Sequence, residues 1–125
     1  GEPCADKMFG VHCDASQRVV GLNLYQNALS GTVPSELGRL TSLAGLSLRI
    51  NAVSGTLPSE LGELTALRGV GIYNNRLSGA LPTQLARLGP KTCWLNYAQC
   101  RTALDDASCA PNSNRNNFSC PVPAL

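Results

Sequence analysis

The sequence predicts an α/β solenoid, a chain wound into stacked coils with a short strand on one side of each coil and a short helical turn on the other. The first observation is a repeat of 24 residues, since the segment that starts at Leu22 returns at Leu46 and again at Val70. The second is that residue types return in fixed columns: Asn27, Asn51 and Asn75, then Gly31, Gly55 and Gly79, then Pro34, Pro58 and Pro82. Self-similarity at a fixed period indicates stacked units, and about three of them are needed to bury a continuous core.

Each unit begins with an alternating segment. Leu22 and Leu24 alternate with Asn23 and Tyr25, and this period of two predicts a short strand whose leucines face the core. The equivalent apolar pairs in the next two units are Leu46 with Leu48 and Val70 with Ile72. Because every unit runs in the same direction, these strands must be parallel.

The Asn column follows each strand, where the backbone turns inward. A buried turn leaves backbone N–H and C=O groups without partners, and an Asn side chain supplies both a donor and an acceptor. We therefore predict a structural role, and no catalytic role, for Asn27, Asn51 and Asn75.

The rest of each unit predicts a bend and then a short helical turn. Gly31 permits a tight bend, Pro34 suits the first turn of a short helix, and Glu36 lies where the helix dipole favours an acid. Leu37 and Leu40 follow at helical spacing and are expected to face the core. The expected outer rim is a solvated face without acid–base chemistry, formed by Glu36, Arg39, Glu60, Glu63 and Arg87.

The whole unit, with Leu-Ser-Gly-Thr-Val-Pro or Leu-Ser-Gly-Thr-Leu-Pro after the Asn, resembles the plant-type leucine-rich repeat of receptor-kinase ectodomains and polygalacturonase-inhibiting proteins. The resemblance covers about residues 19–88. It implies a right-handed leucine-rich-repeat superhelix with a short parallel sheet on its concave face and 3₁₀ or α turns on its convex face. It also implies a second short strand and a ladder of Asn side chains. The segment ending Gly10-Val11-His12-Cys13 resembles the family's N-terminal cap, with Met8 where the family has Trp.

Six cysteines lie only at the two ends of the chain, which predicts disulfide-pinned caps in an oxidising compartment. We expect an N-terminal cap over residues 1–18, three repeats over 19–90 and a C-terminal cap over 91–125. Cys4 and Cys13 form the natural N-terminal pair. The other four allow three pairings, and Cys93–Cys100 with Cys109–Cys120 is the favoured one. The cysteine spacings do not match a zinc site, and His12 is expected to be an exposed cap residue.

The period is expected to fail after the third repeat. An unshifted register would place Asn96 in a core column, which is unfavourable for an unpaired polar group. We therefore predict a shift of one residue that turns Cys93 inward and Trp94 outward. The tail beyond it is expected to form a loop-rich cap, in which Asn117 begins an N-glycosylation sequon.

The outward positions of the strands hold the candidate binding residues. Tyr25, Arg49 and Tyr73 form one column, and strands about 4.8 Å apart would let the arginine stack between the two tyrosines. Tyr and Arg are enriched at binding hot spots, although the same column could serve only strand packing. Glycines at 21, 45, 69 and 71 predict a shallow trough beside it. The full candidate set for ligand binding is Tyr25, Gln26, Ser47, Arg49, Ile50, Tyr73, Asn74 and Trp94.

Composition and motifs argue against several function classes. A net charge of +2 with scattered Lys and Arg gives no nucleic-acid footprint, and no apolar run approaches the ~18 residues of a membrane span. The repeats hold no nucleophile–base pair and no phosphate loop, so we expect no enzyme activity, no cofactor and no metal. We expect a secreted or cell-surface recognition module that binds a protein, peptide or glycan through the concave face, with homo-oligomers possible. The alternative is a structural, self-assembling surface protein.

Overall fold

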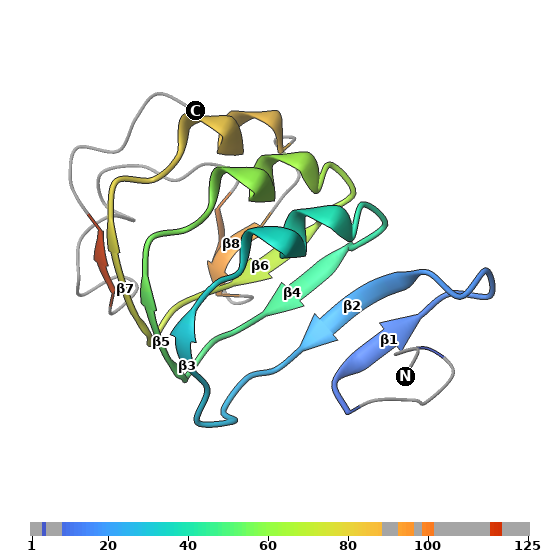
Figure 1. Ribbon diagram of the computed structural model, residues 1–125, viewed down its shortest axis with the longest axis horizontal. Coiled ribbons are helices and arrows are strands. Elements are labelled where there is room, and N and C mark those ends of the chain that lie inside the picture. The colour runs from blue at the N-terminus through green and yellow to red at the C-terminus, as the bar shows by residue number, and fades with distance from the viewer. Residues whose placement is uncertain (1–3, 5–8, 89–92, 97–98, 102–115, 119–125) are drawn as a thin grey trace.

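The computed structural model describes residues 4, 9–88, 93–96, 99–101 and 116–118. They form stacked coils, and each of the first three coils passes through a first sheet, a second sheet and a 3₁₀ helix on its third side (Figure 1). The predicted solenoid with parallel strands is confirmed.

The first sheet carries the alternating segments. In sheet order, its described strands are β1 (Val11–Cys13), β2 (Val19–Asn23), β4 (Gly45–Ser47), β6 (Gly69–Gly71), β8 (Cys93–Asn96) and β9 (Gln99–Arg101). β2, β4, β6 and β8 are parallel neighbours, whereas β1 and β9 pair antiparallel at the two edges. The register pairs Gly21 with Gly45 and Gly45 with Gly69, so equivalent residues of successive repeats lie side by side.

The second sheet and the helices complete each coil. The second sheet is parallel, in the order β10 (Asn117–Phe118), β7 (Arg76–Gly79), β5 (Ala52–Gly55) and β3 (Ser30–Thr32). The helices are η1 (Ser35–Arg39), η2 (Ser59–Glu63) and η3 (Thr83–Arg87). The Pro of each repeat lies one residue before its helix, in extended conformation, and not in the first turn as predicted. None of the described helices is long and apolar enough to cross a membrane.

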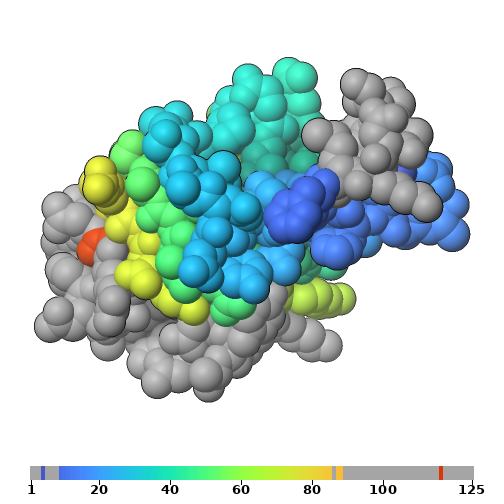
Figure 2. All heavy atoms as spheres, turned by 90° about the horizontal axis from the view of Figure 1, so that it is seen from below, coloured from blue at the N-terminus to red at the C-terminus, as the bar shows by residue number. Residues whose placement is uncertain are grey.

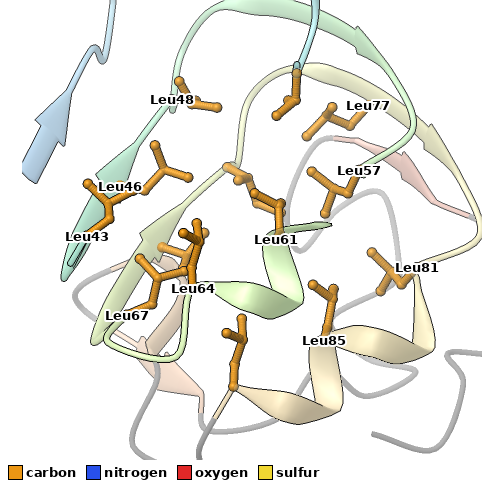
Figure 3. Close-up of a cluster of buried hydrophobic side chains, with 14 of the residues drawn as sticks. Leu43, Leu46, Leu48, Leu57, Leu61, Leu64, Leu67, Leu77, Leu81 and Leu85 are labelled. Carbon is orange, nitrogen blue, oxygen red and sulfur yellow. The ribbon is translucent and has the colours of Figure 1, made fainter. Parts of the chain in front are cut away.

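The core lies inside the coils, where leucines from the strands and the helices point toward one another (Figure 3). The largest fully buried side chains are Leu43, Leu46, Leu61, Leu64, Ile72 and Leu77. Their counterparts in the first coil, such as Leu22 and Leu37, are only partly buried and pack against this cluster. The five predicted rim residues are all exposed.

The Asn side chains form a ladder between coils. The Asn51 Oδ1 atom accepts hydrogen bonds from the backbone N–H groups of Asn27 and Leu29, and its Nδ2 atom donates to the Leu24 and Leu48 carbonyls. Asn75 repeats the pattern one coil later, with Val53 N–H as donor and the Leu48 carbonyl as acceptor. Each rung therefore satisfies backbone groups of its own coil and of the coil before it.

The N-terminal hairpin covers one edge of the first sheet. A disulfide joins Cys4 to Cys13, with the two Cα atoms 5.8 Å apart, as predicted. Asp14 orders the turn between β1 and β2: its side chain accepts the backbone N–H groups of Arg18 and Ser16, and it forms an ion pair with the Arg18 guanidinium. The hydrogen bond from the Arg18 backbone N–H is the main cause of a lowered pKa for Asp14, and the Arg18 side chain adds to it.

The fourth coil corrects the predicted register. β8 pairs with β6 so that Cys93 lies beside Gly69 and Trp94 beside Val70, which is the unshifted 24-residue register. The predicted one-residue shift is therefore wrong, and the argument that placed Trp94 on the outward face fails with it. The β8 backbone pairs with β6, and this pairing keeps the 24-residue register whichever side chains β8 carries.

The Asn ladder also continues past the third repeat, through a residue that the sequence analysis missed. Asn116 is buried, accepts the Leu77 N–H and donates to the Ile72 carbonyl. The Leu77 N–H lies 39 residues before Asn116, whereas the equivalent separation is 22 residues for Asn75, a difference of 17. The same separation of 39 residues recurs where β10 pairs with β7, at Asn117 and Ser78. The fourth coil is therefore a repeat with 17 extra residues between its first strand and its Asn.

Candidate functional site

The repeat spacing brings Tyr25, Arg49 and Tyr73 together as predicted, with Arg49 stacked on the Tyr25 ring and hydrogen-bonded to the Tyr73 hydroxyl. The Arg49 Cζ atom lies 4.8 Å from the centroid of the Tyr25 ring, and the Arg49 Nη1 atom donates a hydrogen bond of 3.4 Å to the Tyr73 hydroxyl. The three residues follow β2, β4 and β6, whose pairing fixes their spacing. Tyr25 is 41% exposed, and Arg49 and Tyr73 are half-buried. The arrangement holds the Arg49 guanidinium between the Tyr25 ring and the Tyr73 hydroxyl.

The next column lies at tight turns. Gln26, Ile50 and Asn74 have φ values of 53°, 57° and 62°, in the left-handed region. Asn tolerates this region, but a β-branched residue there is an outlier. Ile50 is also 39% exposed, so a strained apolar side chain faces solvent beside Arg49. Strain of this kind is kept where it serves a purpose, which makes Ile50 a candidate binding residue.

We expect the substitution Ile50→Asn to raise the free energy of unfolding by about 1 kcal/mol, because it relieves the left-handed strain. The reverse change at the equivalent position, Asn74→Ile, should lower it by a similar amount. Urea unfolding followed by circular dichroism measures both. A loss of stability in Ile50→Asn would mean that Ile50 contributes packing and is not strained in its turn.

The glycine trough is shorter than predicted. Gly45 is open, since no atom lies within 4 Å of the place where its Cβ would be, and Gly21 is partly exposed. Gly69 and Gly71 are buried, so the predicted extension of the trough along β6 is wrong. What remains is a hollow of about 220 Å³ over β2 and β4, lined by His12, Gly21, Leu22, Asn23, Gly45, Leu46, Ser47 and Arg49.

His12 joins this hollow from the cap. It pairs with Gly21 across β1 and β2, and its Cβ lies 3.3 Å from where a Gly21 Cβ would be. The residue is exposed, as predicted. Because β1 pairs antiparallel with β2 in the first sheet, His12 also lines the hollow. The alternating pattern of Val11–Cys13 indicates a short strand, but it does not reveal which strand this segment pairs with.

A second hollow adjoins the first at the N-terminal end. It has a volume of about 500 Å³ and is lined by Phe9, Gly10, His12, Asn23, Tyr25, Gln26 and Asn27. His12 and Asn23 line both hollows. Phe9, missed by the sequence analysis, is 83% exposed. In Figure 2 the dark blue atoms near the N-terminus lie against the cyan atoms of the first coil. The site thus combines a glycine-floored hollow with an aromatic one.

The remaining predicted residues are placed only in part. Trp94 lies in β8, Cys93 and Cys100 lie in β8 and β9, and Asn117 lies in β10, but their side chains are outside the described part of the structure. Cys109 and Cys120 lie outside the described residues, and so does their predicted pairing. Among the described residues, no cluster of three His, Cys, Asp or Glu side chains could hold a metal ion.

Parallel strands in 24-residue register, a leucine core and an Asn ladder define this class of protein as a leucine-rich-repeat domain. No family model matches the chain. The receptor-like kinase TMK2 of Arabidopsis thaliana is 45% identical over 42 residues, which are 34% of this chain and 5% of that protein. The chain carries a plant-type leucine-rich-repeat domain, similar to those of receptor-kinase ectodomains.

Two solved structures support this assignment. The crystal structure of PEPR1-AtPEP1 matches at 37% identity and a TM-score of 0.69, over 76% of this chain and 13% of that one. The leucine-rich-repeat ectodomain of the Arabidopsis receptor kinase HAESA, in complex with an N-terminally extended IDA peptide hormone ligand, matches at 36% identity and a TM-score of 0.63. That match covers 74% of this chain and 16% of the other. The chain therefore spans only a small part of the length of the proteins it resembles.

Proposed function

We propose that this domain recognises a peptide or protein ligand, outside the cell or at its surface, through the outward face of the first sheet. The observation that carries the proposal is the ordered Tyr25–Arg49–Tyr73 column beside two adjoining hollows. The HAESA ectodomain, which this chain resembles, is solved with a peptide hormone. A strained, exposed Ile50 at the same place fits a surface kept for binding.

The size of the face favours an extended peptide over a folded protein. The three strands that carry Tyr25, Arg49 and Tyr73 span only about 14 Å of the six-stranded first sheet, too little for the ~800 Å² per partner of a standard stable interface. An extended peptide needs less surface, and aromatic hollows accept its side chains. We include in the proposal a right-handed superhelix, disulfides that pin a cap over 1–18 and a C-terminal cap over 91–125, and glycosylation at Asn117. The C-terminal cap includes the fourth coil.

The competing proposal is self-assembly. β3 lies at the edge of the second sheet, and the described residues provide no strand beyond it, whereas β1 covers the corresponding edge of the first sheet. An uncovered edge strand is a template for pairing with another chain. Light scattering over a hundredfold concentration range separates the two proposals, because assembly through β3 requires a mass that rises with concentration.

Filling the smaller hollow provides the direct test of peptide binding. In Gly45→Val, the new side chain should project into the open space over β4 and abolish peptide retention. The free energy of unfolding should stay within about 1 kcal/mol of the wild-type value. The control Ser30→Val adds the same side chain to the exposed strand β3 and should bind normally. Binding is measured by affinity selection from a soluble random octapeptide library. Unchanged retention by Gly45→Val would place the ligand elsewhere.

A further inference from the structure

We propose that the smaller hollow is a subsite for the carboxylate of an Asp or Glu side chain in the bound peptide. This inference rests on the proposed function and names the ligand chemistry of the same site. It follows from one buried hydroxyl, one oriented cation and the size of the hollow.

The buried hydroxyl belongs to Ser47. The residue is 5% exposed and lines the hollow, and its Oγ atom is buried with no hydrogen-bond partner in this structure. Buried polar atoms in native proteins nearly always have a partner, and an unmade hydrogen bond is unfavourable. Ser47 lines the hollow, so an acceptor atom of a ligand bound there would supply the partner that this hydroxyl lacks.

The lining favours an acceptor that is negatively charged. Arg49 lines the same hollow, and the Tyr25 ring and Tyr73 hydroxyl hold its guanidinium in place. His12 and Asn23 also line the hollow, and both side chains carry N–H groups. None of the described lining residues is Asp or Glu. A carboxylate is the peptide group that accepts several hydrogen bonds and gains from a charged donor, whereas a Lys or Arg side chain would meet Arg49 unfavourably.

The dimensions suit one side chain. A volume of about 220 Å³ lies below the 300–1,000 Å³ or so of sites that enclose a whole small molecule. Gly45 leaves the floor open over β4, so the peptide backbone can approach the sheet closely there, whereas the His12 side chain lies against Gly21. The aromatic hollow of about 500 Å³ shares His12 and Asn23 with it, and can take a neighbouring apolar side chain beside Phe9 and Tyr25.

The test is affinity selection from a random octapeptide library prepared in two forms, with free and with amidated C-termini. We expect enriched peptides in both forms to carry Asp or Glu at one fixed position. Changing that residue to Asn or Gln should weaken binding at least about tenfold, as should Ser47→Ala and Arg49→Gln in the protein. Arg39→Gln removes an exposed charge from η1 on the other side of the coil and should bind like the wild type. Thermal unfolding verifies that each variant folds. If Arg49→Gln fails to fold, Ser47→Ala, which removes only the hydroxyl, still tests the inference.

Three results would overturn the inference. Enriched peptides without an acidic preference would refute the subsite and leave the proposed function standing. Binding that needs a free C-terminus and no acidic side chain would assign the hollow to the terminal carboxylate instead. No enrichment by the wild-type protein would refute the proposed function, and the subsite with it.

Discussion

Replacing Asn75 by alanine should lower the free energy of unfolding by about 3–5 kcal/mol, the largest effect expected of any polar substitution in the described coils. The Asn75 side chain is buried, and the residue is 7% exposed. Its Nδ2 atom lies 2.8 Å from the Leu48 carbonyl and 3.1 Å from the Ile72 carbonyl, and its Oδ1 atom accepts the Val53 N–H at 3.0 Å. Alanine would leave these backbone groups buried without partners, and each such group costs about 1–3 kcal/mol, not additively.

The ladder contains its own control. Asn27 is exposed, and its Nδ2 atom donates a hydrogen bond of 3.1 Å to the Tyr25 carbonyl within the same coil. No coil precedes it among the described residues, so Asn27→Ala should cost less than about 1 kcal/mol. Guanidinium unfolding of the two variants and the wild type provides the comparison. Similar losses for both would mean that the Asn residues act through local turn propensity and not by joining coils.

The repeats were predictable because the same physics recurs in each of them. A period of 24 residues fixes strand pairing, so the assembly of Tyr25, Arg49 and Tyr73 followed from residue numbers alone. The burial of Leu46 and Ile72 followed from alternation. Predicting these features required only the contacts between one repeat and the next.

The two ends of the chain were less predictable because the fixed period is absent from β1 and is interrupted by 17 extra residues in the fourth coil. The contribution of His12 and Phe9 to the site depends on how β1 pairs with β2, an antiparallel contact that the period does not encode. Asn116 fills the fourth rung only because 17 extra residues precede it, and an insertion hides a repeat from any search at fixed spacing. The prediction for Trp94 was wrong because it gave more importance to keeping Asn96 out of the core than to continuous strand pairing. In the structure, β8 keeps the pairing register of the earlier strands.

The stacking of the helices explains a second glycine column and provides the other large prediction. A Cβ on Gly38 would lie 2.5 Å from the Glu60 carbonyl oxygen, and one on Gly62 would lie 2.4 Å from the Gln84 carbonyl oxygen. Both neighbours are backbone atoms of the next helix, η2 or η3, so no side chain can rotate away. The third repeat has Ala86 at this position, and the described residues contain no fourth helix that would require glycine there.

Gly62→Ala should therefore lower the free energy of unfolding by about 1–3 kcal/mol, because η3 must move away from η2. The sign is informative, since alanine is intrinsically favoured over glycine in a helix and in the absence of the neighbour would stabilise the chain. Gly45→Ala is the matched control: its Cβ would meet no atom within 4 Å, and stability should stay unchanged or rise slightly. Chemical denaturation measures both. If Gly62→Ala proves as stable as Gly45→Ala, the helices are not held at the close spacing that stacks one coil on the next.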